Sequence, residues 1–236
     1  MRKLLLLLAI TPSFLFAQDN VIQEFGDGAD DFSHYRWEIG INGGVNITSL
    51  EGLGADTMSL NSNIGRLYGI TLTFHFNKYL ALKTDFDMEN KGWTINDVDV
   101  VTNPTTGATE QQDVIQNLNY FDIPAFLHVG FGNRMKFDFN FGPYFAFLLD
   151  DQAWYEGADG VEVPVTEGFS DFSETDFGLT YGAGIDFAVG DRLSLGFDFL
   201  IEKGLKEITS EGVKNQSIDF DFGINFLFGD KKKKKK

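Results

Sequence analysis

Three histidines are the side chains of this sequence best suited to acid–base chemistry. His34 lies near the start of the chain, and His75 and His128 lie in segments where apolar and polar residues alternate. A hydrolase would need a histidine beside a nucleophile such as Ser194 and a carboxylate such as Asp198. Nothing in the spacing places these two residues against a histidine, and no HExxH, GxSxG or phosphate-loop motif occurs. The sequence therefore predicts no catalytic site and no cofactor.

Carboxylates are the other side chains that could do chemistry here, by binding metal ions. The chain has no cysteine, which excludes disulfides, thiolate metal sites and a lipid-modified N-terminal cysteine. Residues 149–175 hold eight Asp and Glu but neither Lys nor Arg. Such oxygen ligands suit hard cations, although no EF-hand spacing is present. The alternative is a solvated, repulsive surface loop. We predict an acidic rim that collects divalent cations, formed by Asp150, Asp151, Glu156, Asp159, Glu89 and Glu202.

The overall charge excludes one class of partner. The chain has 35 Asp and Glu against 19 Lys and Arg, which gives a net charge of −16. A protein that binds nucleic acid neutralises phosphates with a basic surface, so the opposite sign here argues against that function.

The elements that must position these side chains are β-strands. In "RLYGITLTFHFN", large apolar residues occupy every second position from Tyr68 to Phe76, and Gly, Thr and His lie between them. This period of two is typical of a strand with one apolar face. It recurs over residues 80–89, 136–147, 176–189, 193–202 and 220–228, and more weakly near Trp37 and Phe121. The sequence therefore predicts eight strands.

The connections between these strands alternate in length. Tight turns are expected at residues 77–78, 132–134 and 190–192. Long polar loops are expected at 47–65, 93–116, 149–173 and 206–216. Short turns at one end and long loops at the other are typical of a bacterial outer-membrane barrel. The fold class predicted is all-β: a transmembrane, up-and-down antiparallel β-barrel of eight strands.

A soluble β-sandwich or a lipocalin-like barrel would have to bury the apolar faces of the strands instead. The rows of Phe are too many and too bulky for one narrow core, whereas they need no packing partner if they face lipid. The interior of an eight-stranded barrel is just wide enough for side chains to fill it. We expect Lys83, Lys136 and Arg36 to pair with inward carboxylates. An interfacial girdle of aromatic residues is predicted at the strand ends: Trp37, Tyr79, Trp93, Tyr120 and Tyr144.

The two ends of the chain complete the predicted domain organisation. Arg2 and Lys3, an apolar run and Ala17 indicate a signal peptide over residues 1–17. An acidic periplasmic leader follows at 18–35, the barrel covers 36–229, and a basic tail covers 230–236. The tail either contacts anionic headgroups or a periplasmic partner, or is a disordered extension. The predicted location is the bacterial outer membrane.

Several of these segments resemble one known family. "GINGGVN", "FNKYLALKTDF" and "YFDIPAFLHVGF" are similar in order and spacing to segments of the PorT-like outer-membrane β-barrel family of Bacteroidetes, over nearly the whole mature chain. The resemblance implies an eight-stranded outer-membrane barrel, but it does not imply one activity. The name-giving member of the family belongs to the type IX secretion machinery.

The last strand resembles the signal by which barrel-assembly machinery recognises its substrates. Asp221, Gly223, Phe226 and Phe228 give the pattern of a polar residue, a glycine and two alternating aromatic residues. The expected partners are therefore this machinery, outer-membrane lipid and lipopolysaccharide, and a periplasmic or secretion-complex protein. We expect a non-catalytic structural or interaction role, with a narrow channel for cations or small solutes as the alternative.

Overall fold

A computed structural model describes residues 35–52, 59–103, 107–157, 159–165, 171–189 and 192–230. The predicted signal peptide, the leader up to His34, the lysines of the tail and two residues of the predicted turn at 190–192 lie outside the described residues. No helix in the described ranges is long and apolar enough to cross a membrane.

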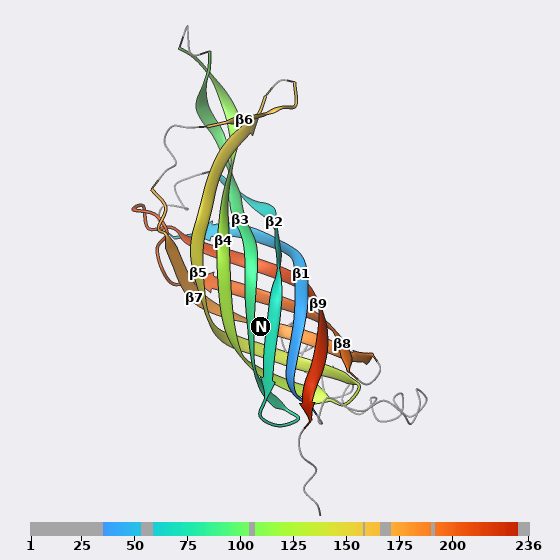
Figure 1. Cartoon of the computed structure of the whole chain (residues 1–236). Helices are drawn as coiled ribbons and strands as arrows, with labels where there is room; N and C mark the ends of the chain where they lie inside the picture. Colours follow the sequence, from blue (N-terminus) through green and yellow to red (C-terminus); the bar gives the residue numbers. More distant parts are fainter. Residues whose placement is uncertain are drawn as a thin grey trace, which may run out of the picture.

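Eight antiparallel strands form a closed barrel (Figure 1). Each strand pairs with its neighbours in chain order, and the last strand pairs with the first. A short additional strand, β6 (Glu162–Pro164), pairs only with β5. The predicted eight-stranded fold is confirmed. The barrel strands are β1 (Tyr35–Glu51), β2 (Leu60–His75), β3 (Leu80–Asn103), β4 (Ala108–Gly132), β5 (Met135–Glu156), β7 (Thr175–Val189), β8 (Leu193–Gly204) and β9 (Lys214–Asp230).

Closure of the barrel depends on the pairing of β1 with β9. This ladder runs from the pair Tyr35–Asp230 to the pair Glu51–Lys214. Hydrocarbon cannot satisfy the backbone groups of an open sheet edge, so a sheet that spans a membrane has to close on itself. The apolar last strand therefore closes the barrel against the first, as its sequence predicts.

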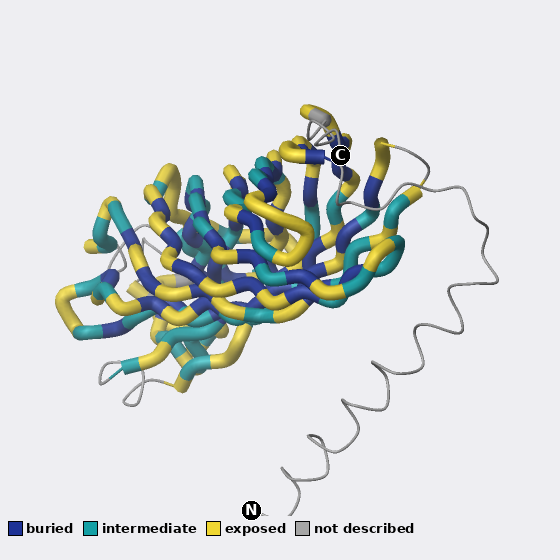
Figure 2. Tube along the Cα trace, turned by 90° about the horizontal axis from the view of Figure 1, so that it is seen from below, coloured by how far each residue is buried: buried dark blue, intermediate teal, exposed yellow. Residues whose placement is uncertain are grey.

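Side chains alternate between the lumen and the outer surface along each strand. On β8, Phe197 and Phe199 are 47% and 38% exposed, whereas Asp198 and Glu202 are only 8% and 4% exposed. Figure 2 shows this alternation as dark blue and yellow bands along the strands. The apolar residues thus point outward, where they face lipid, and the polar residues fill the interior.

One end of the barrel carries the tight turns. Asn77 Oδ1 accepts hydrogen bonds from the backbone N–H groups of Tyr79 and Leu80, at 2.8 and 3.1 Å, in the turn between β2 and β3. Gly132, with φ +128°, begins the turn between β4 and β5. The start of β1 and the end of β9 lie at this end as well. Short turns face the periplasm in outer-membrane barrels, so we assign this end to the periplasmic side.

The predicted loop at 93–116 is wrong, because almost all of it is strand. β3 and β4 continue to the pair Asn103–Ala108, and β5 extends to Glu156, where it pairs with β6. These strands project beyond the rest of the barrel (Figure 1). This part of the strands lies beyond the lipid-facing surface of the barrel, so apolar and polar residues do not alternate strongly there. We call residues 96–103, 108–115, 151–156 and 162–165 the outer sheet.

Part of the predicted aromatic girdle is also wrong. Trp37 and Tyr79 are exposed on the outer surface, but Trp93, Tyr120 and Tyr144 are buried inside the barrel. The physical reason is the strand period. Tyr120 shares the parity of the inward-facing even residues of β4, and Tyr144 that of the inward-facing even residues of β5.

Candidate functional site

The centre of the lumen is organised around one buried lysine. Lys91 is 1% exposed, and its Nζ lies 3.0 Å from Glu89 Oε2, 3.0 Å from Asp122 Oδ2 and 2.6 Å from Glu202 Oε2. These carboxylates come from β3, β4 and β8. Removing such charges from water is costly unless they are paired and hydrogen-bonded. We call these four residues the Lys91 cluster.

The Lys91 cluster is held by further contacts. Asn46 Nδ2 donates to Glu89 Oε1 at 2.7 Å, and Thr180 Oγ1 donates to Glu202 Oε1 at 3.0 Å. Lys91 Nζ also lies 4.7 Å from the centroid of the Tyr144 ring, within the range of a cation–π interaction. The ammonium group is therefore fixed by contacts on several sides.

Lys91 was not predicted from the sequence. The alternation was followed only over residues 80–89, although the inward positions Lys83, Asp85, Asp87 and Glu89 continue with the same period to Lys91. Following the alternation to the next inward position would have placed this lysine in the lumen.

An apolar cluster closes the outer end of the lumen. The connection between β8 and β9 folds into the barrel at Ile208, which is fully buried. Ile208 N–H donates to the carbonyl of Val213, and Ser173 N–H donates to the carbonyl of Ile208, each at 2.8 Å. We call this cluster the outer plug, and its buried members are Trp93, Leu118, Tyr120, Tyr144, Ala146, Ile208 and Val213.

A second polar cluster fills the periplasmic half of the lumen. Lys83 Nζ lies 2.5 Å from Asp198 Oδ2, which confirms that Lys83 pairs with an inward carboxylate. His75 Nε2 lies 2.6 Å from Glu38 Oε1. Lys136 is also buried, whereas Arg36 is exposed and does not point into the lumen as predicted. At the periplasmic end, Tyr35 and Leu227 form a small buried apolar contact.

The geometry separates the residues that could have formed a hydrolase site. Ser194 Oγ is buried and has no hydrogen-bond partner among the described residues. His75 is bonded to Glu38, and His128 Nδ1 lies 2.9 Å from Asn140 Oδ1. A serine nucleophile needs a histidine base within hydrogen-bond reach, and Ser194 lacks that contact.

The predicted acidic rim is divided between two places. Glu89 and Glu202 are buried in the Lys91 cluster. The other members, Asp150, Asp151, Glu156 and Asp159, are exposed on the strand β5 and just beyond it. The structure does not bring the six residues together, and cation binding by the exposed members stays a prediction.

The predicted assembly signal lies on β9 with its residues on both faces. Asp221 is buried and accepts a hydrogen bond of 3.1 Å from Asn42 Nδ2. Phe226 and Phe228 point outward, and their rings are stacked with centroids 6.5 Å apart. Gly223 pairs with Gly196 of β8. Recognition of these residues by assembly machinery stays a prediction.

A closed antiparallel barrel with an apolar outer surface and a polar, filled lumen defines an outer-membrane β-barrel protein. Residues 16–210 match the family described as outer membrane protein β-barrel domain. The chain belongs to this family, and its location is the bacterial outer membrane.

Several solved structures are similar to this chain. OprG from Pseudomonas aeruginosa is 12% identical, with 84% of this chain and 99% of that chain covered and a TM-score of 0.49. Neisserial surface protein A is 14% identical, with 81% and 97% covered and a TM-score of 0.45. Ail from Yersinia pestis is 13% identical, with 81% and 99% covered and a TM-score of 0.41. No curated protein matches the chain.

Proposed function

We propose that this protein is a non-catalytic, non-conducting outer-membrane barrel that acts by binding a partner through its outer sheet. The observation that carries the non-conducting part of this proposal is the filled lumen. The outer plug closes one end, and the Lys91 cluster spans the interior beneath it. An eight-stranded barrel packed in this way is filled by side chains and leaves no continuous water-filled path along its axis.

A narrow cation channel is the second candidate, because the lumen is rich in carboxylates that would attract cations. A conducting path would nevertheless have to pass Trp93, Tyr144 and Ile208, which are almost completely buried in the outer plug. These closely packed side chains leave a hydrated cation no path, so we favour the closed barrel.

The absence of catalysis is part of the same proposal. Both described histidines have other partners, and Ser194 is hydrogen-bonded to neither. These contacts support a polar interior network for the histidines and not a nucleophile–base pair.

The outer sheet is the surface we propose for binding. Its strands are joined by a small apolar cluster of Val100, Val114 and Tyr155, and it carries exposed carboxylates such as Asp99 and Asp151. An acidic surface that projects beyond the membrane favours a partner with a basic surface. The resemblance to PorT-like proteins, whose name-giving member belongs to a secretion machinery, supports a role as a subunit of an envelope or secretion assembly. The lysine tail would contact a second, periplasmic partner.

Crosslinking in native outer membranes, followed by affinity isolation and mass spectrometry, tests this role. The proposal expects one partner in stoichiometric amounts with the wild type. It expects loss of that partner when Asp99 and Asp151 are both changed to Lys. A matched control changes Lys203 and Lys206, near the other side of the mouth, to Glu. Recovery of the barrel alone from the wild type would contradict an interaction role.

A further inference from the structure

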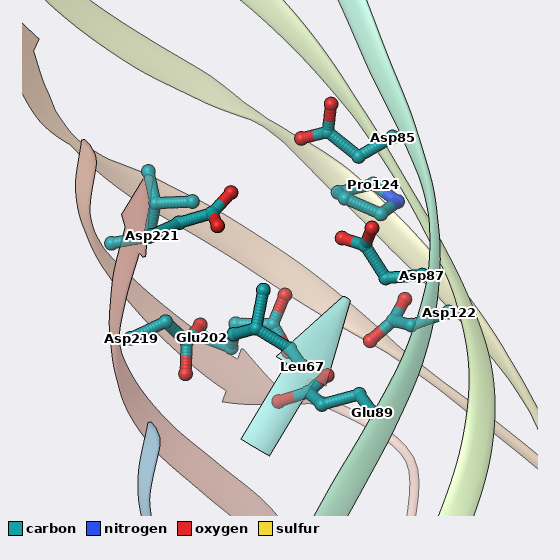
Figure 3. A pocket seen from close by; sticks show the side chains of 10 residues that line it. Leu67, Asp85, Asp87, Glu89, Asp122, Pro124, Glu202, Asp219 and Asp221 are labelled. Atoms are coloured by element: carbon teal, nitrogen blue, oxygen red, sulfur yellow. The ribbon is translucent and has the colours of Figure 1, made fainter. Parts of the chain in front are cut away.

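A small cavity lies beside the Lys91 cluster, inside the barrel. Seven carboxyl groups from β3, β4, β8 and β9 line it, together with Leu67, Pro124 and Leu200. Figure 3 shows these carboxylates converging on one space from facing walls. The cavity has a volume of about 20 Å³. A cavity needs a volume of roughly 10–15 Å³ to hold one water molecule, so a small ion or water fits here and an organic ligand does not.

Three of the carboxylates are placed to share one cation. Ligand oxygens of Glu89, Glu202 and Asp219 all lie within 4.8 Å of one another. Calcium binds oxygen at about 2.3–2.6 Å, so two oxygens on opposite sides of the ion lie roughly 4.6–5.2 Å apart. The three groups therefore match the size of a calcium coordination shell.

Unpartnered oxygens supply an independent indication of a ligand. Asp219 is 3% exposed, yet its Oδ1 has no hydrogen-bond partner among the described residues. The same holds for one oxygen each of Asp85, Asp122 and Asp221, which line the same cavity. Leaving a buried acceptor without a donor or cation is costly, and four such atoms around one cavity add to that cost.

The local charge also favours a cation. Lys91 contributes one positive charge, and it contacts Glu89, Asp122 and Glu202. Asp219 lies beyond these contacts, on the strand β9. Lys91 and, nearer the periplasm, Lys83 are thus two ammonium groups against seven carboxyl groups, and a further cation would relieve the repulsion among them.

We propose that this cavity binds one Ca²⁺ ion through Asp219, Glu89 and Glu202. The ligand set contains only oxygen, which suits hard cations. Magnesium usually retains several water molecules, and the cavity has room for about one, so calcium fits better. This site is separate from the exposed carboxylates of β5, and it is independent of partner binding at the outer sheet.

Equilibrium dialysis with radioactive Ca²⁺ tests the site directly. The full mature chain is refolded in a neutral detergent without lipopolysaccharide, so that neither lipid nor detergent binds the ion. The wild type is expected to bind one Ca²⁺ per chain. Asp219→Asn keeps the shape of the side chain and removes its charge, and we expect it to lower the affinity at least tenfold. The control, Asp150→Asn with Asp151→Asn, alters exposed carboxylates and should bind like the wild type.

Refolding of each variant is checked by its shifted migration on gels without heating. If Asp219→Asn does not fold, terbium luminescence of the wild type provides a second test. Trp93, Tyr120 and Tyr144 lie in the neighbouring outer plug and should sensitise Tb³⁺ in the cavity, and Ca²⁺ should displace it. Three results would overturn the proposal: no Ca²⁺ binding or sensitised emission by the wild type, unchanged binding by Asp219→Asn, or loss of binding in the exposed control alone.

Discussion

Lys91 Nζ and Glu202 Oε2 lie 2.6 Å apart although 111 residues separate them in the chain. Lys91 is on β3 and Glu202 is on β8, and in the closed ring these strands are four positions apart, on opposite walls. Lys83 and Asp198 join the same two strands nearer the periplasm. Two ion pairs therefore cross the full width of the lumen at different heights, and this is why the barrel interior is filled.

Replacing Lys91 by Met should strongly destabilise the barrel. The change leaves Glu89, Asp122 and Glu202 buried without their common cation, and breaking a buried pair costs about 3–5 kcal/mol. Urea titration of the refolded barrel in detergent, followed by tryptophan fluorescence, measures this loss. Lys203→Met is the control, because Lys203 pairs with Glu51 at 3.1 Å on the surface, where a pair contributes about 0–1 kcal/mol. Equal effects of the two changes would contradict the role assigned to the Lys91 cluster.

The pair of Lys83 with Asp198 should show strong coupling in a double-mutant cycle. Lys83→Met alone and Asp198→Leu alone each leave one charged group of the lumen without its ion-pair partner, whereas the double variant removes both charges. We expect the double variant to be more stable than the sum of the single effects predicts, by about 1–3 kcal/mol. The same urea titrations give the coupling. Additive effects would mean that the two residues do not interact across the lumen.

Ile208→Ala should weaken the outer plug. Ile208 is fully buried, so its truncation is expected to lower the free energy of unfolding by about 2–5 kcal/mol. It should also release the connection over residues 205–213 and make it a protease site. Leu205→Ala is the matched control, because Leu205 lies in the same connection but is 47% exposed. A connection that resists protease equally in both variants would show that Ile208 does not anchor it.

Val100→Asp should unfold the outer sheet without unfolding the barrel. Val100 is buried against Val114 and Tyr155, whereas its neighbour Val101 is 52% exposed. An unpaired carboxylate in the small apolar cluster should open these strands to protease, while the heat-dependent gel shift of the barrel persists. Val101→Asp should leave both properties unchanged. Loss of the gel shift in Val100→Asp would mean that the outer sheet and the barrel fold as one cooperative unit.

The parts of the fold that sequence predicted best are those inside the membrane. There one face of each strand meets lipid and the other meets the polar lumen, so residues such as Phe197 and Asp198 alternate clearly. Beyond the membrane no face of a strand meets lipid and only a small apolar cluster around Val100 is buried, so this difference becomes weak. The strands over residues 93–116 therefore had the composition of a loop, although backbone pairing continues to Asn103 and Ala108.

The candidate sites were harder to predict, because they depend on contacts between strands that are not neighbours. Period two places Lys91, Glu202 and Asp219 on the inner face, but it does not give their heights in the lumen. Those heights follow from the register of every ladder around the ring, including the shift between Asn119 and Tyr120. The outer plug depends in addition on Ile208, whose connection has no periodic pattern.

Single-channel recording in a planar lipid bilayer tests the closed lumen most directly. The refolded wild type is inserted and recorded in a concentrated salt solution of a monovalent cation. A lumen filled by the Lys91 cluster and closed by the outer plug predicts a flat record, with no steady conductance. Steady, cation-selective current steps from the wild type would contradict it and would make the protein a channel.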